Sequence, residues 1–98
     1  MAADNRSGTS LSVRLVVRIG VRESTHVVSD FPCVIGRSAS ADIVVQDPSV
    51  SGSHAELFLA DGRLAIRDLD STNGVYLEYE AVSETVLALP ANVQLVSV

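Results

Sequence analysis

The sequence contains no lysine and no tryptophan, and it has a single cysteine, Cys33. Its seven basic residues are therefore all arginines, and twelve acidic residues outnumber them to give a formal net charge of −5. A chain this acidic lacks the basic surface of a general nucleic-acid-binding protein and the basic clusters of a peripheral membrane protein. One cysteine cannot form an internal disulfide, so the sequence implies no oxidising compartment.

Hydrophobic runs long enough to cross a membrane are also missing. No apolar segment approaches the roughly 20 residues of a transmembrane helix, and the first residues lack the pattern of a secretory signal peptide. We therefore expect a cytoplasmic location without membrane insertion. The 98 residues, of which 47% are hydrophobic and 19% charged, suffice for one globular domain but not for two.

The sequence pattern divides the chain into a polar arm and one β-rich domain. Residues 1–10 are small and polar without periodicity, so we expect a disordered N-terminal arm there and a folded domain over residues 11–98. Within the domain, apolar residues alternate with polar ones and no long helical period appears. This alternation, with short β-branched and apolar runs, predicts strands over 13–19, 25–28, 33–35, 43–45, 54–59, 63–67 and 75–80. Two short apolar pieces, 86–89 and 93–96, close the chain.

Turn signals separate these short strands. Asp61-Gly62 and Asn73-Gly74 both predict hairpin turns. Within the strand at 54–59, the alternation places Leu57 and Leu59 on one face. Many short strands with frequent turns predict an all-β sandwich or barrel without a helix longer than about two turns.

Three loops carry more hydroxyl groups and glycines than a turn requires, namely residues 36–42, 48–54 and 70–74. Together they offer the Arg37 guanidinium, several hydroxyls, the Asn73 carboxamide and many backbone N–H groups. This inventory suits an oxyanion such as phosphate. Taken singly, Arg37 fits a solvated strand end, Asn73-Gly74 fits a plain hairpin turn, and His54 fits a structural histidine.

The order and spacing of these motifs favour a common role. Gly36-Arg37, Ser51-x-x-His54 and Asn73-Gly74, with the segments DIVV, DPSVS, HAEL and DLDSTNG, resemble the forkhead-associated (FHA) domain family. The resemblance covers roughly residues 11–96. It implies a β-sandwich of ten to eleven short, mostly antiparallel strands, which binds phosphothreonine peptides through loops at one end.

The resemblance also implies a role for each matching residue. Arg37 and Ser51 would hold the phosphate, and Thr72 would add a hydroxyl to the phosphate or to nearby backbone. Asn73 would pair with the main chain of the peptide. Of the supporting residues, Gly36 and Gly74 would permit a tight backbone. His54 would hydrogen-bond across the loops without touching the ligand.

The sequence departs from the family pattern in three places. Gly52 stands where many members carry a cationic residue, and Ala91-Asn92 replaces a Gly-Asp pair near the end. The chain also stops at Val98, where the family usually adds one more strand beside the first. We therefore expect either a trimmed domain or a missing last strand, with an unpaired edge near residues 13–19.

Side chains suited to catalysis are few and scattered. Cys33 lies in an apolar strand pattern and is expected to be inert. A Ser51–His54 dyad would lack a third, orienting group. Asp68 and Asp70 fit solvated strand-end carboxylates better than a metal pair, and two histidines with one cysteine do not make a zinc site. We predict a protein that is not an enzyme and holds no metal or cofactor.

Two functions are compatible with the sequence. The first is a phosphothreonine-dependent adaptor or signalling module, whose partner is a protein phosphorylated by a Ser/Thr kinase. The second is a phosphate-independent FHA-like scaffold, for example in a bacterial secretion or envelope assembly, which Gly52 and the acidic charge favour. In either case we expect a monomeric domain, either alone or as part of a larger protein. The arginine-only basic residues and abundant Ala and Val suggest a GC-rich bacterial genome.

Overall fold

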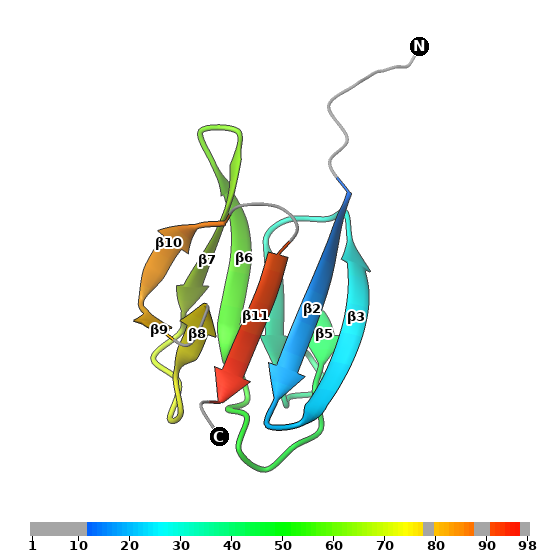
Figure 1. Cartoon of the computed structure of the whole chain (residues 1–98). Helices are drawn as coiled ribbons and strands as arrows, with labels where there is room; N and C mark the ends of the chain where they lie inside the picture. The colour runs from blue at the N-terminus through cyan, green and yellow to red at the C-terminus, as the bar shows by residue number, and fades with distance from the viewer. Residues whose placement is uncertain (1–11, 78–79, 88–90, 97–98) are drawn as a thin grey trace.

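The computed structural model describes residues 12–77, 80–87 and 91–96, the last of these by their backbone. Within these ranges the chain forms ten strands and no helix (Figure 1). The predicted all-β sandwich is confirmed. The described residues therefore include no helix that could span a membrane. The predicted disordered arm, residues 1–10, lies outside the described residues.

The strands form two five-stranded sheets. The first sheet has the order β10-β7-β6-β4-β5 and the second has the order β3-β2-β11-β8-β9. The strands of the first are β4 (Cys33–Gly36), β5 (Ile43–Val44), β6 (Ala55–Ala60), β7 (Arg63–Asp68) and β10 (Glu84–Val86). Those of the second are β2 (Val13–Ile19), β3 (Arg22–Val28), β8 (Val75–Leu77), β9 (Glu80–Val82) and β11 (Ala91–Val96). Two pairings are parallel, β4–β5 and β2–β11, and the others are antiparallel.

The core lies between the sheets and follows from the alternation in the sequence. Val13, Leu15 and Val17 on β2 are buried, and they face Ile35, Leu57, Ile66 and other buried residues of the opposite sheet. Leu57 is fully buried, but Leu59, two residues further along β6, is 45% exposed. Alternation therefore predicts the face of a strand residue, but not how far the core extends along the strand.

The two predicted hairpin turns have different outcomes. Asp61 and Gly62 both have positive φ, +52° and +78°, and they join the antiparallel pair β6–β7 as predicted. Asn73-Gly74 joins β7 to β8, which belong to different sheets. The prediction of a hairpin at Asn73-Gly74 is wrong, and only Gly74 of this pair has a positive φ, +88°.

The expectation of an unpaired sheet edge near residues 13–19 is also wrong. β2 is antiparallel to β3 on one side and parallel to β11 on the other. The first residues of β11, Ala91 and Asn92, align with Leu15 and Val16. Ala91 and Asn92 therefore do not prevent this strand from forming, although they depart from the family pattern.

The topology brings the three polar loops to one end of the sandwich. β4 and β7 both run antiparallel to β6, so β4 and β7 end where β6 begins. The β4–β5, β5–β6 and β7–β8 loops consequently lie at the lower end of Figure 1, together with the β2–β3 turn. The β6–β7 hairpin lies at the opposite end.

Candidate functional site

The β4–β5 and β5–β6 loops run side by side at this end because Gly36, which has no side chain, lets their backbones approach closely. The Arg37 N–H donates to Ser51 O at 2.9 Å, and the Ser38 N–H donates to Gly52 O at 3.1 Å. A Cβ atom added to Gly36 would lie 2.0 Å from Gly52 O, closer than any real contact. Only glycine therefore fits at position 36 with the loops in this arrangement.

The side chain of Arg37 is anchored at one point and open at its tip. Its Nε–H donates to Val50 O at 3.0 Å. In the described part of the chain, its two terminal nitrogens have no hydrogen-bond or ion-pair partner. A hollow of about 340 Å³ opens beside it, lined also by Gln46, Asp47 and Pro48. The terminal nitrogens of an anchored guanidinium can bind two oxygens of one anion.

Ser51 and Thr72 connect the β5–β6 loop to the β7–β8 loop. The Thr72 N–H donates to Ser51 Oγ at 3.0 Å. Because Ser51 Oγ accepts this bond, the hydroxyl keeps its own hydrogen for another acceptor. Thr72 is exposed, and its hydroxyl has no partner among the described residues. The two hydroxyl-bearing residues that the sequence singles out are therefore in contact at the loop end, through the Thr72 backbone.

His54 is fully buried beneath these loops and bonds to both of them. The Ser51 N–H donates to His54 Nδ1 at 3.0 Å, and His54 Nε2 lies 2.7 Å from Gly74 O. Because Nδ1 accepts, Nε2 carries the hydrogen and donates it to the Gly74 carbonyl. The ring is thus a neutral bridge between the Ser51 and Gly74 segments. Both nitrogens are occupied by backbone, so His54 cannot activate the Ser51 hydroxyl.

Asn73 is held in place by the loop opposite. Its Nδ2 donates to Ser49 O at 2.7 Å, which leaves Oδ1 and one N–H for other partners. Two hydrogen bonds within the β7–β8 segment also fix its conformation. The Ser71 N–H donates to Asp68 Oδ1 at 2.9 Å, and the Gly74 N–H donates to Ser71 Oγ at 2.9 Å. A carboxamide in this position can bond a peptide main chain through both its oxygen and its nitrogen.

Comparison with known proteins identifies this arrangement. A family model described as the FHA domain matches residues 33–95, which is well over half of the chain. The chain belongs to the FHA domain family.

Named relatives of this FHA domain are bacterial. The chain is 37% identical over 90 residues to the glycogen accumulation regulator GarA of Mycolicibacterium smegmatis, covering 91% of this chain and 55% of GarA. The chain thus spans about half the length of the curated relatives that it matches.

Two solved structures show similar folds. One comes from a structural and functional analysis of phosphothreonine-dependent FHA domain interactions, with a TM-score of 0.66, 28% identity and 80% coverage of both chains. The other is the FhaA FHA domain in complex with the intracellular domain of Rv3910, with a TM-score of 0.60 and 31% identity, covering 66% of this chain and 71% of that chain.

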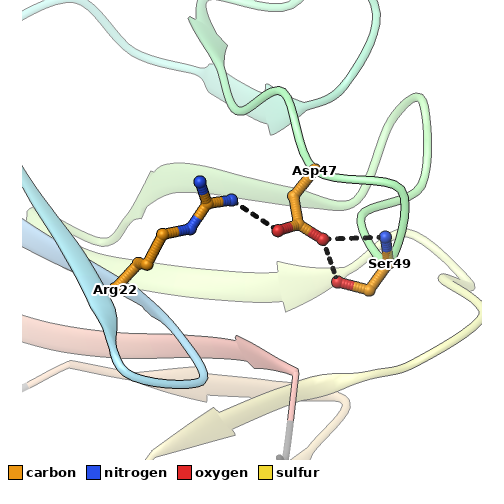
Figure 2. A network of polar contacts seen from close by, with 3 residues as sticks. All are labelled: Arg22, Asp47 and Ser49. Atoms are coloured by element: carbon orange, nitrogen blue, oxygen red, sulfur yellow. Dashed lines mark hydrogen bonds and ion pairs between the residues drawn. The ribbon is translucent and has the colours of Figure 1, made fainter.

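Sequence analysis missed one polar network of this FHA domain, formed by Arg22, Asp47 and Ser49 (Figure 2). Asp47 Oδ1 accepts from the Ser49 N–H at 3.0 Å and from the Ser49 hydroxyl, and Asp47 Oδ2 pairs with Arg22 Nη2. The hydrogen bonds from Ser49, followed by those from Arg22, lower the pKa of Asp47. The D-P-S segment is a signal for the Asp–Ser turn, but no local pattern links Arg22 to Asp47, 25 residues away.

This network connects the start of β3, next to the β2–β3 turn, to the β5–β6 loop. Arg22 lies at the start of β3, in one sheet, whereas Asp47 follows β5 of the other sheet. Ser49, bonded to Asp47, supplies the carbonyl that holds Asn73. Arg22 is therefore one end of a chain of contacts that leads to Asn73.

Two other side chains suited to catalysis, Cys33 and His26, lie on strands β4 and β3 rather than in the three loops. Cys33 is buried, and burial raises the pKa of its thiol to about 11, so it stays protonated and unreactive at neutral pH. Ser24 Oγ and His26 Nε2 lie 2.8 Å apart on β3, but no acidic residue in the described ranges orients that histidine. The described residues also contain no cluster of three or more His, Cys, Asp or Glu side chains that could hold a metal ion.

Proposed function

We propose that this FHA domain is a phosphothreonine-peptide-binding adaptor module. One observation carries the proposal: the terminal nitrogens of Arg37, which have no partner among the described residues, lie at the end where the Ser51, Thr72 and Asn73 loops are joined by hydrogen bonds. Relatives support it, because one similar FHA structure was studied for phosphothreonine-dependent interactions and another was solved with a protein partner.

Each side chain has a distinct part in the proposed complex. Arg37 binds two phosphate oxygens through its terminal nitrogens, and Ser51 donates its remaining hydroxyl hydrogen to a third oxygen. Thr72 adds a second hydroxyl. Asn73 bonds the peptide main chain through its free Oδ1 and N–H. His54 and Gly36 do not touch the ligand but keep the loops at their observed separation.

Electrostatic attraction at long range does not assist this binding. The net charge of −5 repels a phosphopeptide, and Gly52 provides no second cation beside Ser51. Recognition then depends on short-range contacts at Arg37. The proposed partner is a cytoplasmic protein phosphorylated on threonine by a Ser/Thr kinase, and the domain acts by binding rather than by catalysis.

A phosphate-independent scaffold is the second candidate, and Gly52 is the observation that favours it. A Cβ added to Gly52 would have only one neighbour within 4 Å, the Ser38 Cβ at 3.9 Å, so the site has room for the larger cationic residue common in the family. A scaffold would use the same fold for partners without phosphate. The alternatives differ in one measurable property, the ratio of affinities for phosphorylated and unphosphorylated peptides.

The deciding experiment is a calorimetric titration with a degenerate peptide library of fixed phosphothreonine and with its unphosphorylated counterpart. We expect binding of the phosphorylated pool only. Arg37→Ala should weaken it by about tenfold to a few hundredfold, the equivalent of one strong charge-assisted pair. Arg37→Lys should restore only part of the affinity because an ammonium lacks the planar fork.

The control for this experiment is Arg63→Ala, because Arg63 is exposed and begins β7, directly after the β6–β7 hairpin at the opposite end of the sandwich. It should bind the phosphorylated pool as wild type does, and both variants should unfold within about 0.5 kcal/mol of wild type. Equal binding of the two pools by wild type, or unchanged binding by Arg37→Ala, would assign the domain to the scaffold class.

A further inference from the structure

The sandwich is open along one side, where both sheets end. β3 is the edge of one sheet and β5 the edge of the other, and Figure 1 shows them on the same side of the molecule. β5 has only two residues, whereas β3 has seven. The short strand cannot cover the inner face of the long one near the β2–β3 turn.

A groove of about 270 Å³ fills this opening. Its floor includes Val17, which is buried, and Ile19, which packs against the core. Val44 at the end of β5 and Val45 directly after it line the opposite side, and Val44 is 40% exposed. A single aliphatic side chain placed here would be removed from water against four other aliphatic side chains, which is favourable.

The polar groups of the rim are already paired with one another. Arg22 pairs with Asp47, and Ser24 Oγ lies 2.8 Å from His26 Nε2. Glu23 pairs with Arg18 at 2.7 Å. The rim therefore offers no uncompensated charge that would select an ionic ligand, and the groove favours an uncharged, apolar group.

The strand beside the groove can also bind an extended backbone. Among the described strands, β3 pairs only with β2, so every second residue of its other edge presents an N–H and a C=O. An extended segment that pairs with such an edge directs alternate side chains toward the same face of the sheet. On the inner face of β3, that direction leads into the groove.

The groove is continuous with the phosphate-binding end. Gln46 lines both the groove and the hollow beside Arg37. A peptide bound at Arg37 therefore needs to cross only the Gln46 segment to reach the open side of the sandwich. This continuity identifies the occupant as a flanking part of the same peptide.

We propose that the groove between β3 and β5 binds an aliphatic side chain of the threonine-phosphorylated partner, from an extended segment that lies along β3. The proposal rests on the proposed function, since the phosphothreonine at Arg37 brings the segment to the groove. A valine, leucine or isoleucine at one flanking position is then a second determinant of specificity beside the phosphate.

The test uses an oriented peptide library with one fixed phosphothreonine and randomised flanks, followed by titration of a matched peptide pair. The pair carries either leucine or glycine at the flanking position that the library selects. Wild type should bind the leucine peptide about tenfold more tightly, as expected for one partly buried aliphatic side chain. Ser24→Phe fills the groove from an exposed position, so it should bind both peptides with the affinity of wild type for the glycine peptide.

Matched controls separate the groove from the rest of β3. Thr25→Phe places the same ring on the other face of the strand and should keep the leucine preference. Val44→Asp, which introduces a charge into the groove, should lose the preference, whereas Val27→Asp, on the outer face of β3 and 70% exposed in wild type, should keep it. Thermal unfolding of each variant verifies that it is folded.

Four outcomes would overturn the proposal. If wild type requires the phosphate but shows no aliphatic preference, or if Ser24→Phe and Val44→Asp retain that preference, the groove is not a subsite and the proposed function stands. If wild type ignores the phosphate, the proposed function fails and this inference fails with it. A concentration-dependent dimer that Ser24→Phe abolishes would assign the groove to a second copy of the chain.

Discussion

The two ends of the sandwich are built from similar dipeptides but are held in different ways. At one end, Asp61-Gly62 closes the β6–β7 hairpin, and a Cβ added to Gly62 would meet nothing within 4 Å. At the other end, Asn73-Gly74 is held by Ser49 and by His54, residues that precede it by about 20 positions. The hairpin end satisfies a local requirement of the backbone, whereas the loop end depends on contacts between distant segments.

This difference shows where binding specificity can be built. A hairpin turn needs only backbone conformations with positive φ, so its side chains are free to vary. At the loop end, some side-chain groups keep the loops at a defined separation, and the remaining groups on Arg37, Ser51 and Asn73 are those we propose to contact a ligand. Substitutions at the two ends should therefore have unequal effects.

The largest contrast is expected between two glycines. Gly36→Ala forces Cβ against the Gly52 carbonyl, so the β4–β5 and β5–β6 loops must separate and lose the two backbone hydrogen bonds between them. We expect a loss of about 3 kcal/mol or more in unfolding free energy. Gly62→Ala, strained only by its positive φ, should lose about 1 kcal/mol. Urea unfolding measures both, and equal losses would contradict the contrast.

His54→Ala tests the bridge between the loops. The substitution leaves the Ser51 N–H and the Gly74 carbonyl without their partner, so it should lower the unfolding free energy by about 1–3 kcal/mol. Phosphopeptide affinity should fall as well, because Ser51 and the Asn73-Gly74 segment lose their common support. His26→Ala is the control, with a change below about 0.5 kcal/mol. A bridging role is untenable if His54→Ala preserves both stability and binding.

Much of the fold, but less of the site, could be predicted from the sequence. The period of two identified most of the strands and the buried face of β2, and Asp61-Gly62 marked a true hairpin, because these features depend on neighbouring residues. The period did not predict β9 (Glu80–Val82) as a separate strand, and β10 covers Glu84–Val86 rather than the apolar piece at 86–89. The Asn73-Gly74 turn was misassigned because hydrogen bonds from other loops determine its conformation. The pairing of β2 with β11 and the contact between Arg22 and Asp47 depend on segments far apart in the chain, for which no local pattern exists.

A smaller effect is expected for Arg22, at the far end of the network in Figure 2. Its side chain is 66% exposed, so Arg22→Gln should change the unfolding free energy by less than about 1 kcal/mol. Phosphopeptide affinity should still fall about two- to fivefold, because the loop whose Ser49 carbonyl holds Asn73 loses its ion pair with β3. Arg63→Gln, at the hairpin end, should leave affinity unchanged in the same titration. An identical change in phosphopeptide affinity for the two variants would show that Arg22 does not support Asn73.

The smallest expected effect is the change in stability with pH that Asp47 causes. Because the pKa of Asp47 is lowered in the folded protein, its ionised form stabilises the fold at and above the ordinary pKa of aspartate. That stabilisation is lost as the pH falls through the lower, folded value. Asp47→Asn should thus be less stable than wild type at neutral pH, and the difference should shrink in strong acid. Unfolding free energies measured against pH would contradict this if the difference were constant.

The parallel pairing of β2 and β11 gives the domain a direction. β2 begins at the hairpin end and β11, running beside it, finishes at the loop end (Figure 1). The chain therefore enters β2 at one pole of the sandwich and leaves β11 at the other. In a longer polypeptide, a domain attached directly ahead of β2 would lie far from a phosphopeptide bound as we propose. A domain attached directly after β11 would lie beside that site.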